Sequence, residues 1–259
     1  MNLYDRITFN LFTNCTINSP KIFPINILFK SLLDTFNLDP TKIKINIFID
    51  NNPYKKNYDN FLKNLKKYFS SMKTNAVFYK TKSLVDGFAK TFDICDTQFI
   101  FNLEHDWIFY KRNIMHTLDE ILNSIQDEEV SIVKLHSHSI REDTYSKKLN
   151  KTYFNNIKYY QCSSTSNYCQ IINRERYKKK YLKLIDLNAI KSYGIESNLQ
   201  NVSDNYIYAS KNNLRAIQHI NGRIKNGFEN KYGEICQYCG LSKADVFECS
   251  IKPIRKGKY

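Results

Sequence analysis

Residues 99–107 read Phe-Ile-Phe-Asn-Leu-Glu-His-Asp-Trp, and this stretch decides the fold. A run of apolar residues ends abruptly in two acids, Glu104 and Asp106, which are separated by one residue. The apolar run predicts a buried strand that carries both carboxylates to the edge of a sheet. Carboxylates in this arrangement suit Mg²⁺ or Mn²⁺, which prefer hard oxygen ligands and can bridge to phosphate oxygens. The alternative is that the two acids cap the following helix.

Strand-like and helix-like segments alternate on both sides of this stretch. Apolar patterning predicts strands over residues 7–14, 44–49, 76–79, 98–103 and 130–135. Helical periodicity predicts helices over residues 23–36, 57–72, 84–92, 113–124 and 174–184. This alternation is typical of a parallel sheet covered on both faces, and ligands bind such sheets at the carboxyl ends of the strands. Asp50 and the acids at 104 and 106 all fall at such ends.

Composition limits the cellular setting and the domain count. The chain has 259 residues, of which 42% are hydrophobic, so it can bury one large core and is expected to form one principal domain. No apolar run approaches the roughly 20 residues of a transmembrane helix, and a signal peptide is not expected. Seven irregularly spaced cysteines are typical of reduced thiols. We therefore expect a soluble, cytoplasmic protein.

The net charge of +14 invites an interpretation as a nucleic-acid-binding protein. The densest lysine runs, at residues 63–67 and 174–183, have helix-like spacing beside tyrosines. Solvated helix faces explain this spacing, and a phosphate-rich substrate would use the same positive field. The polar segment 141–156 shows no periodicity and is predicted to be a mobile loop.

The phrase Leu-Glu-His-Asp-Trp at residues 103–107 resembles the Leu-Glu-Asp-Asp-Trp sequence of small nucleotide-sugar glycosyltransferases of the GT-A fold. The unit ending in Asp50 and the small-residue helix at 85–90 also resemble this family in order and spacing. His105 departs from the usual Asp of the phrase but leaves both outer acids in place. The resemblance implies a Rossmann-like, mostly parallel sheet covered by helices on both faces.

The same resemblance implies a division of the chain. Residues 1–227 would form the glycosyltransferase domain, with a nucleotide-binding half over about 1–110 and an acceptor half over about 111–227. Residues 228–259 would form a small C-terminal appendage.

The resemblance also implies a role for each acid. Asp106 would ligate a divalent cation, Mn²⁺ or Mg²⁺, that bridges the two phosphates of a nucleotide sugar. Glu104 would assist through the water shell of the cation or through the ribose. Asp50 would accept hydrogen bonds from the base or the ribose.

Three further residues are candidates for the donor site. His219 lies where many GT-A enzymes place a C-terminal metal ligand, although a lone histidine is also a common structural residue. Arg223 could reach phosphate oxygens, and Lys82 is another candidate for binding the donor.

An inverting transferase also needs a general base for the acceptor hydroxyl. Glu196, in Tyr-Gly-Ile-Glu-Ser, resembles the residue at that position in the family, and Asp143 and Glu142 are reserves. The alternative for Glu196 is an acid near the N-terminus of a helix.

Some remaining side chains have both a functional and a structural interpretation. Trp107 could stack on a sugar or fill the core, and His116, expected on a helix, is interpreted as structural. Cys236 and Cys239 form a CxxC motif that could bind a structural zinc, but four ligands are usual, so a tight turn with two thiols is the alternative.

Three hypotheses follow. The first is a metal-dependent glycosyltransferase, transferring a hexose or pentose from a nucleotide sugar to a hydroxyl acceptor such as a glycan. The second keeps this chemistry with modified DNA as the acceptor. The third is a non-catalytic nucleic-acid-binding α/β module. The sequence leaves open the donor sugar, the nucleotide base, the acceptor and the stereochemistry.

Overall fold

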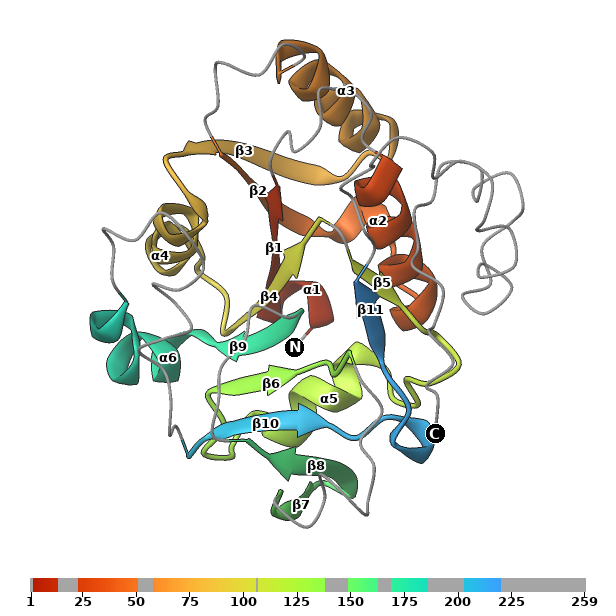
Figure 1. Cartoon of the computed structure of the whole chain (residues 1–259), viewed down its shortest axis with the longest axis vertical. Helices are drawn as coiled ribbons and strands as arrows, with labels where there is room; N and C mark the ends of the chain where they lie inside the picture. The colour runs from red at the N-terminus through yellow and green to blue at the C-terminus, as the bar shows by residue number, and fades with distance from the viewer. Residues whose placement is uncertain are drawn as a thin grey trace, which may run out of the picture.

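The computed structural model describes residues 2–13, 23–50, 58–105, 107–137, 149–162, 169–185 and 203–219. Nine of the described strands form one sheet at the centre of the molecule (Figure 1). In their order across the sheet, the strands are β3 (Asn75–Thr81), β2 (Lys44–Asp50), β1 (Ile7–Thr13), β4 (Phe99–Glu104), β9 (Gln170–Asn173), β6 (Ile132–Lys134), β10 (Asn205–Tyr208), β8 (Ile157–Gln161) and β7 (Lys151–Phe154).

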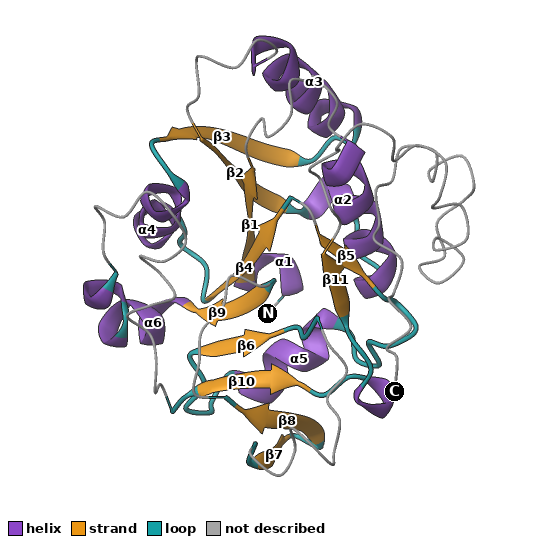
Figure 2. Cartoon of the chain, viewed as in Figure 1, coloured by secondary structure: helices purple, strands orange, loops and turns teal. Residues whose placement is uncertain are grey.

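Helices cover both faces of this sheet, as Figure 2 shows. The α-helices are α1 (Leu3–Arg6), α2 (Phe23–Phe36), α3 (Tyr58–Ser71), α4 (Leu84–Ile94), α5 (Leu118–Ile125) and α6 (Arg174–Lys180). Short 3₁₀ turns are η1 (Pro40–Lys42), η3 (Leu182–Leu184) and η4 (Lys211–Asn213). Helices α2, α3 and α5 pack on one face in the larger hydrophobic cluster, and α4 and α6 pack on the other face.

The first half of the sheet has the predicted βα alternation. Strands β3, β2, β1 and β4 are all parallel, and each lies within two residues of a strand predicted from the apolar pattern. Helices α2, α3 and α4 likewise match the predicted segments to within two residues at each end. A parallel arrangement needs crossover helices, which the alternating sequence supplies.

The second half of the sheet is mixed. Strand β9 runs antiparallel between β4 and β6, whereas β10 is parallel to β6. Strands β7 and β8 form an antiparallel hairpin at the edge. The prediction of a mobile loop over 141–156 is therefore wrong for residues 151–154, which form β7.

The β7–β8 turn explains this error. Asn155 and Asn156 have φ of 45° and 65°. Two-residue hairpin turns need positive φ at both central positions, and Asn adopts this conformation more readily than most residues. The Asn-Asn pair is therefore a hairpin signal that the polarity of the segment obscured.

Helix α5 begins later than predicted, because Thr117 caps it. The Thr117 hydroxyl accepts a hydrogen bond from the Glu120 N–H, and the Glu120 carboxylate accepts one from the Thr117 N–H at 2.7 Å. This capping box makes Leu118 the first helical residue, so the helix predicted from residue 113 is shorter. His116 consequently lies before the helix rather than on it.

A second sheet pairs β5 (Trp107–Phe109) with β11 (Ile217–His219) in antiparallel register. Helix α2 packs beside β5, and the Ser31 hydroxyl accepts a hydrogen bond from the Phe109 N–H at 3.1 Å. The two-stranded sheet thus joins the acidic motif to a segment far along the chain. Among the described residues, no helix is long and apolar enough to cross a membrane.

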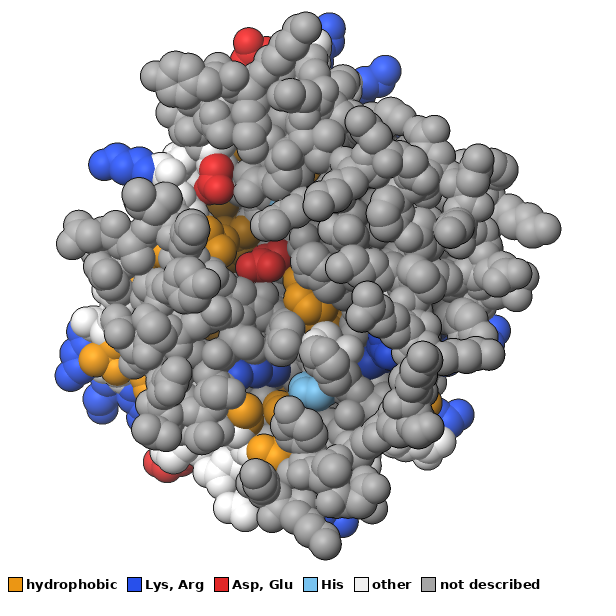
Figure 3. All heavy atoms as spheres, viewed as in Figure 1, with side chains coloured by type: hydrophobic (Ala, Val, Ile, Leu, Met, Phe, Trp, Pro, Cys, Tyr) orange, Lys and Arg blue, Asp and Glu red, His pale blue; other side chains and the backbone are white. Residues whose placement is uncertain are grey.

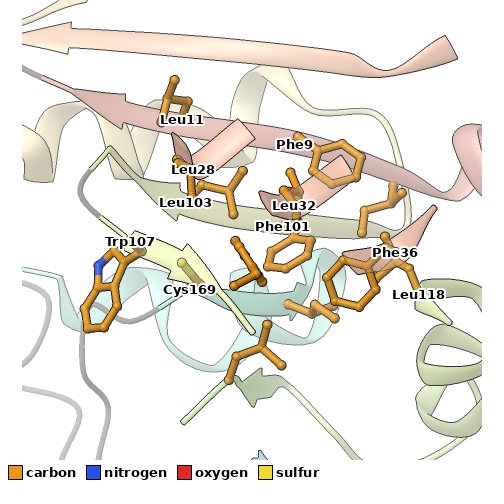
Figure 4. Close-up of a cluster of buried hydrophobic side chains, with 14 of the residues drawn as sticks. Phe9, Leu11, Leu28, Leu32, Phe36, Phe101, Leu103, Trp107, Leu118 and Cys169 are labelled. Carbon is orange, nitrogen blue, oxygen red and sulfur yellow. The ribbon is translucent and has the colours of Figure 1, made fainter. Parts of the chain in front are cut away.

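Aromatic side chains form the centre of the larger hydrophobic cluster. Phe101 on β4 is fully buried, and its ring lies 5.7 Å from the ring of Phe9 on β1. The rings of Phe36 on α2 and Phe109 on β5 each lie 6.0 Å from it. Figure 4 shows Phe101 beside Phe36 and Phe9 in this cluster. Phe101 therefore connects both sheets with α2.

A buried guanidinium joins the start of β1 to α5. The side chain of Arg6 is 4% exposed, and it donates hydrogen bonds to Asp119 at 2.9 Å, Asn123 at 2.6 Å and Gln126 at 2.8 Å. Of these partners only Asp119 carries a charge. The side chain of Asp119 is 48% exposed, so water can solvate its carboxylate if Arg6 is removed. The buried guanidinium of Arg6 cannot be solvated in this way if Asp119 is removed.

We therefore expect Asp119→Ala to destabilise the fold by about 3 kcal/mol, since it leaves a buried charge with neutral partners alone. Arg6→Met should cost less than Asp119→Ala, because it removes the charge and retains an apolar stem. Urea unfolding measures both. As a control, Lys90→Ala removes the partner of Asp86 in a more exposed pair and should cost less than about 0.5 kcal/mol. An Asp119→Ala loss no greater than that of the control contradicts this argument.

Candidate functional site

Two carboxylates stand at the carboxyl edge of the parallel strands. Asp50 ends β2 and Glu104 ends β4, with β1 between them. Phe12 on β1 lies opposite Glu104 on one side and Phe48 on the other. Since neighbouring strands are about 4.8 Å apart, the two acids are separated by about 10 Å across the sheet. We call the edge that carries Asp50 and Glu104 the acidic rim.

Both acids point to the same face of the sheet. Side chains alternate along a strand, so Asp50 shares a face with Phe48, and Glu104 shares the face of Phe12 in the same register. Phe12 and Phe48 stack at 5.0 Å in the cluster that α4 covers. The acidic rim therefore belongs to the α4 face.

Helix α4 approaches this face closely at Gly87. A Cβ atom at Gly87 would lie 3.2 Å from Phe48 Cβ and 3.4 Å from Phe12 Cε1. The missing side chain thus lets the helix backbone pack against the strands just below the acidic rim. The small-residue helix noted in the sequence has this packing role.

Asp50 and Lys82 lie at neighbouring strand ends. Asp50 pairs in register with Thr81, whose hydroxyl lies 3.5 Å from the Asp50 carboxylate. Lys82 follows Thr81, is exposed, and donates its backbone N–H to Asp86 at 2.9 Å. Partial burial raises the pKa of Asp86, but hydrogen bonds from Lys82 and Lys90 outweigh this effect and lower that pKa below its ordinary value. The ionised Asp86 carboxylate thus holds the backbone of Lys82 at the rim.

Glu104 is half-buried beside Trp107. The Trp107 Nε1 lies 3.5 Å from Glu104 Oε2, and the indole is 4% exposed within the larger hydrophobic cluster. The backbone N–H of His105 donates to the Phe12 carbonyl at 3.1 Å, which continues the β1–β4 ladder past Glu104. This burial favours Trp107 as a core residue over a ring that stacks on a sugar.

The fold brings His219 to the acidic motif. In the two-stranded sheet, His219 lies directly opposite Trp107, one residue from Asp106. The backbone of His219 is described, whereas its side chain is not. Two segments that are far apart in the sequence therefore meet next to Glu104.

Several predicted residues lie outside the part of the chain that the structure describes. They are Asp106, Glu142, Asp143, Glu196, Arg223, Cys236, Cys239 and the proposed appendage 228–259. Within the described ranges, no group of three or more His, Cys, Asp or Glu side chains could hold a metal ion. Glu104 supplies one hard oxygen donor, so a complete site would need Asp106 and His219 as well.

A row of buried polar side chains crosses the same face and was missed by the sequence interpretation. Its members lie opposite one another on five neighbouring strands and are at most 7% exposed. In sheet order they are Asn46, Asn10, Asn102, Gln170 and Lys134. The Asn46 amide donates to Asn10 at 3.1 Å, and the Asn10 amide donates to Asn102 at 3.3 Å.

Lys134 ends this row on the face of the acidic rim. It is 3% exposed, and its strand lies two strands from β4, or about 10 Å from Glu104 across the sheet. A lysine inside an otherwise apolar strand is the sequence signal that would have revealed it, because burying an ammonium group is costly. Lys134 thus places a buried lysine near the candidate site.

Figure 3 shows acidic side chains close to the centre of the face drawn there, beside hydrophobic side chains. The described groups near the rim are thus two carboxylates about 10 Å apart, with Lys82 just after β3, the neighbour of β2, and the buried Lys134 on β6, two strands from β4. Carboxylates accept hydrogen bonds from hydroxyl groups or ligate cations, and lysines bind phosphates.

No protein-family model matches this sequence, and no curated protein matches it in a sequence search. Solved structures do resemble its fold. TarS residues 1–349 from S. aureus align with a TM-score of 0.52 and 13% identity over 80% of this chain and 58% of that one. GlyE, a glycosyltransferase of Streptococcus pneumoniae, aligns with a TM-score of 0.51 and 13% identity over 94% of this chain and 62% of that one.

A third similar structure is GalNAc-T7 with UDP, GalNAc and Mn²⁺, with a TM-score of 0.51 and 10% identity over 83% of this chain and 43% of that one. The chain therefore spans between two fifths and two thirds of the length of these structures. At such low identity the likeness establishes the fold alone. Together with the sheet and its two helical layers, it shows that this chain has a GT-A-like fold, as its sequence predicts.

Proposed function

We propose that this protein is a metal-dependent glycosyltransferase that takes its sugar from a nucleotide-sugar donor bound at the acidic rim. The observation that carries the proposal is the convergence of Asp50 and Glu104 on one face of one edge, with His219 beside the acidic motif. Open α/β sheets bind their ligands at this edge.

The spacing of the two acids suits the two ends of a nucleotide. Asp50 would accept hydrogen bonds from the ribose or the base, because a carboxylate is an acceptor for hydroxyl and N–H groups. Glu104, about 10 Å away across the sheet, would lie near the diphosphate. Lys82, Lys134 and Arg223 would offset the phosphate charge. These separate tasks explain why acids and lysines occur together at one rim.

Asp106 and His219 would ligate the divalent cation and Glu104 would assist through its water shell, since carboxylate and imidazole ligands suit Mn²⁺ and carboxylate ligands suit Mg²⁺. The bound cation would act as a Lewis acid on the diphosphate leaving group. The complex of GalNAc-T7 with UDP, GalNAc and Mn²⁺ supports both ligands by analogy of fold. Glu196 or Asp143 would take the proton of the acceptor hydroxyl as general base.

The proposal includes a glycan as the acceptor and a hexose or pentose as the transferred sugar. The GT-A-like fold, which GlyE shares, supports this choice over a non-catalytic nucleic-acid-binding module. Modified DNA is a second candidate acceptor, for which the positive net charge of +14 is the supporting observation.

A thermal-shift screen tests the donor site. Nucleoside diphosphates and nucleotide sugars are added with and without Mn²⁺, and a ligand at 100 times its dissociation constant should stabilise the fold by about 2.7 kcal/mol. We expect one nucleotide to stabilise the fold, and to do so only when Mn²⁺ is present. Asp50→Asn should weaken this nucleotide about tenfold, because a charge-assisted hydrogen bond is lost.

Asp59→Asn is the matched control, since Asp59 is an exposed aspartate on α3, which packs on the face of the sheet opposite to the acidic rim. It should leave the stabilisation unchanged. A flat response of the wild type to every nucleotide would overturn the transferase proposal and favour the nucleic-acid-binding module.

A further inference from the structure

A second candidate site lies in the other half of the sheet. A cleft of about 670 Å³ is lined by residues of the segment before α5, the β7–β8 turn, β8 and η4. This volume is in the usual range for small-molecule sites. The side chains that matter to the argument are His116, Asn156, Lys158 and Asn212. None of them belongs to the acidic rim.

The cleft opens at the same edge of the sheet as the rim. Asn102 on β4 is connected in register through Gln170 and Lys134 to Ile207 on β10. Ala209, which lines the cleft, is two residues beyond Ile207, just as Glu104 is two residues beyond Asn102. Three strand spacings separate β4 from β10, so Ala209 lies about 14 Å from Glu104 across the sheet, at the same edge. Ala209 shares the face of the acidic rim, whereas Tyr208, the partner of His116, packs on the other face with α5, so the cleft lies at the edge between the two faces.

Tyr208 orients the imidazole of His116. The Tyr208 hydroxyl lies 2.8 Å from His116 Nδ1 and accepts a hydrogen bond from the Met115 N–H at 3.1 Å. Burial raises the pKa of Tyr208, so the hydroxyl keeps its proton and can donate it to Nδ1, although hydrogen bonds from the backbone of Met115 and His116 oppose the shift. In that arrangement the proton of a neutral imidazole is on Nε2, which becomes a donor for a ligand.

The lining is polar and carries positive charge. Lys158 lines the cleft with its ammonium 5.4 Å from the centre of the Tyr160 ring, a cation–π contact that limits its motion. Asn156 and Asn212 add amides, both held on backbone with positive φ, at 65° and 52°. Among the described residues that line the cleft, none is Asp or Glu. Amides and an imidazole suit hydroxyl groups, and the lysine suits an anion.

We propose that this cleft binds the acceptor, and that the acceptor is an anionic oligosaccharide whose charged unit contacts Lys158. This inference rests on the proposed transferase function and names the substrate class. A chain of a few sugar units spans the distance from the cleft to the rim, where its terminal hydroxyl would receive the donor sugar. The charge is a carboxylate or a phosphate on the saccharide.

Isothermal titration calorimetry with the full chain tests the proposal. The probes are trigalacturonate, glucose 6-phosphate, uncharged maltotriose and inorganic phosphate. We expect one of the two charged saccharides to bind more tightly than maltotriose and phosphate, and to lose affinity as salt is added. Binding of trigalacturonate would identify the anionic group as a carboxylate, and binding of glucose 6-phosphate would identify it as a phosphate.

Lys158→Met should weaken that saccharide about tenfold, because it removes a charge-assisted hydrogen bond. Lys211→Met is the matched control. Lys211 is an exposed lysine of η4 that does not line the cleft, and Lys211→Met has the same net charge as Lys158→Met. It should bind as the wild type does. Equal binding by Lys158→Met and wild type, equally tight binding of inorganic phosphate, or binding of neither charged saccharide would overturn the assignment.

The nucleotide screen on the same preparations separates the two proposals. Metal-dependent nucleotide binding without saccharide binding would overturn the cleft assignment and leave the transferase proposal standing. Saccharide binding that is sensitive to Lys158→Met, with no response to any nucleotide, would overturn both the transferase proposal and the acceptor role of the cleft, which would then be a carbohydrate-binding site.

Discussion

Replacement of Asp106 by Asn is expected to lower the metal-dependent turnover of the donor by about a thousandfold, equivalent to about 4 kcal/mol of transition-state stabilisation. An amide is a weaker ligand than a carboxylate for a hard cation, and the leaving diphosphate needs the charge of that cation. Release of nucleoside diphosphate measures the rate. Water can replace the acceptor hydroxyl, so the assay needs no known acceptor.

The neighbouring acid provides an internal comparison. Glu104→Gln should reduce the rate by about tenfold, because Glu104 is assigned to the water shell of the cation or to the ribose and loses one charge-assisted hydrogen bond. Asp59→Asn on the exposed face of α3 should leave the rate unchanged. Removal of the metal by a chelator should reproduce the Asp106→Asn rate. A wild type that is indifferent to the chelator would contradict the metal role of Asp106.

Phe101→Ala is expected to destabilise the fold by about 4 kcal/mol, a value typical of a large aromatic side chain removed from a core. The fully buried ring is within 6.0 Å of the rings of Phe9, Phe36 and Phe109, which belong to β1, α2 and β5. Its loss would leave a cavity where both sheets and α2 meet, and these elements cannot all move to fill it. Chemical denaturation measures the loss of stability.

Two variants control for this prediction. Phe101→Leu retains most of the apolar volume and should cost clearly less than Phe101→Ala. Tyr153→Ala removes an aromatic ring that is 56% exposed at the edge of the sheet and should cost less than about 1 kcal/mol. A Phe101→Ala loss as small as that of Tyr153→Ala would show that this part of the core repacks.

Local sequence patterns predicted the elements of the first half well, because β1, β2 and β4 are runs of buried residues and the helices between the strands have one apolar face. The predicted strand at 98–103 is β4 (Phe99–Glu104), and the predicted helix at 84–92 is α4 (Leu84–Ile94). In the second half, short-range sequence signals for a helix start and a hairpin turn were present, but the prediction followed the average pattern of each segment instead. The capping box at Thr117 moved the start of α5, and the Asn155-Asn156 turn produced β7 from a segment predicted to be a loop.

Apolar periodicity and the positions of Asp50 and Glu104 after apolar strands thus establish an α/β chain with an acidic edge, since they depend on neighbours in the sequence. Three features need the whole chain: β9 between β4 and β6, His219 opposite Trp107, and the cleft at Lys158 and His116. Each depends on pairing between segments distant in sequence. Such pairing is selected by how all the buried faces pack together, and no local pattern encodes that choice.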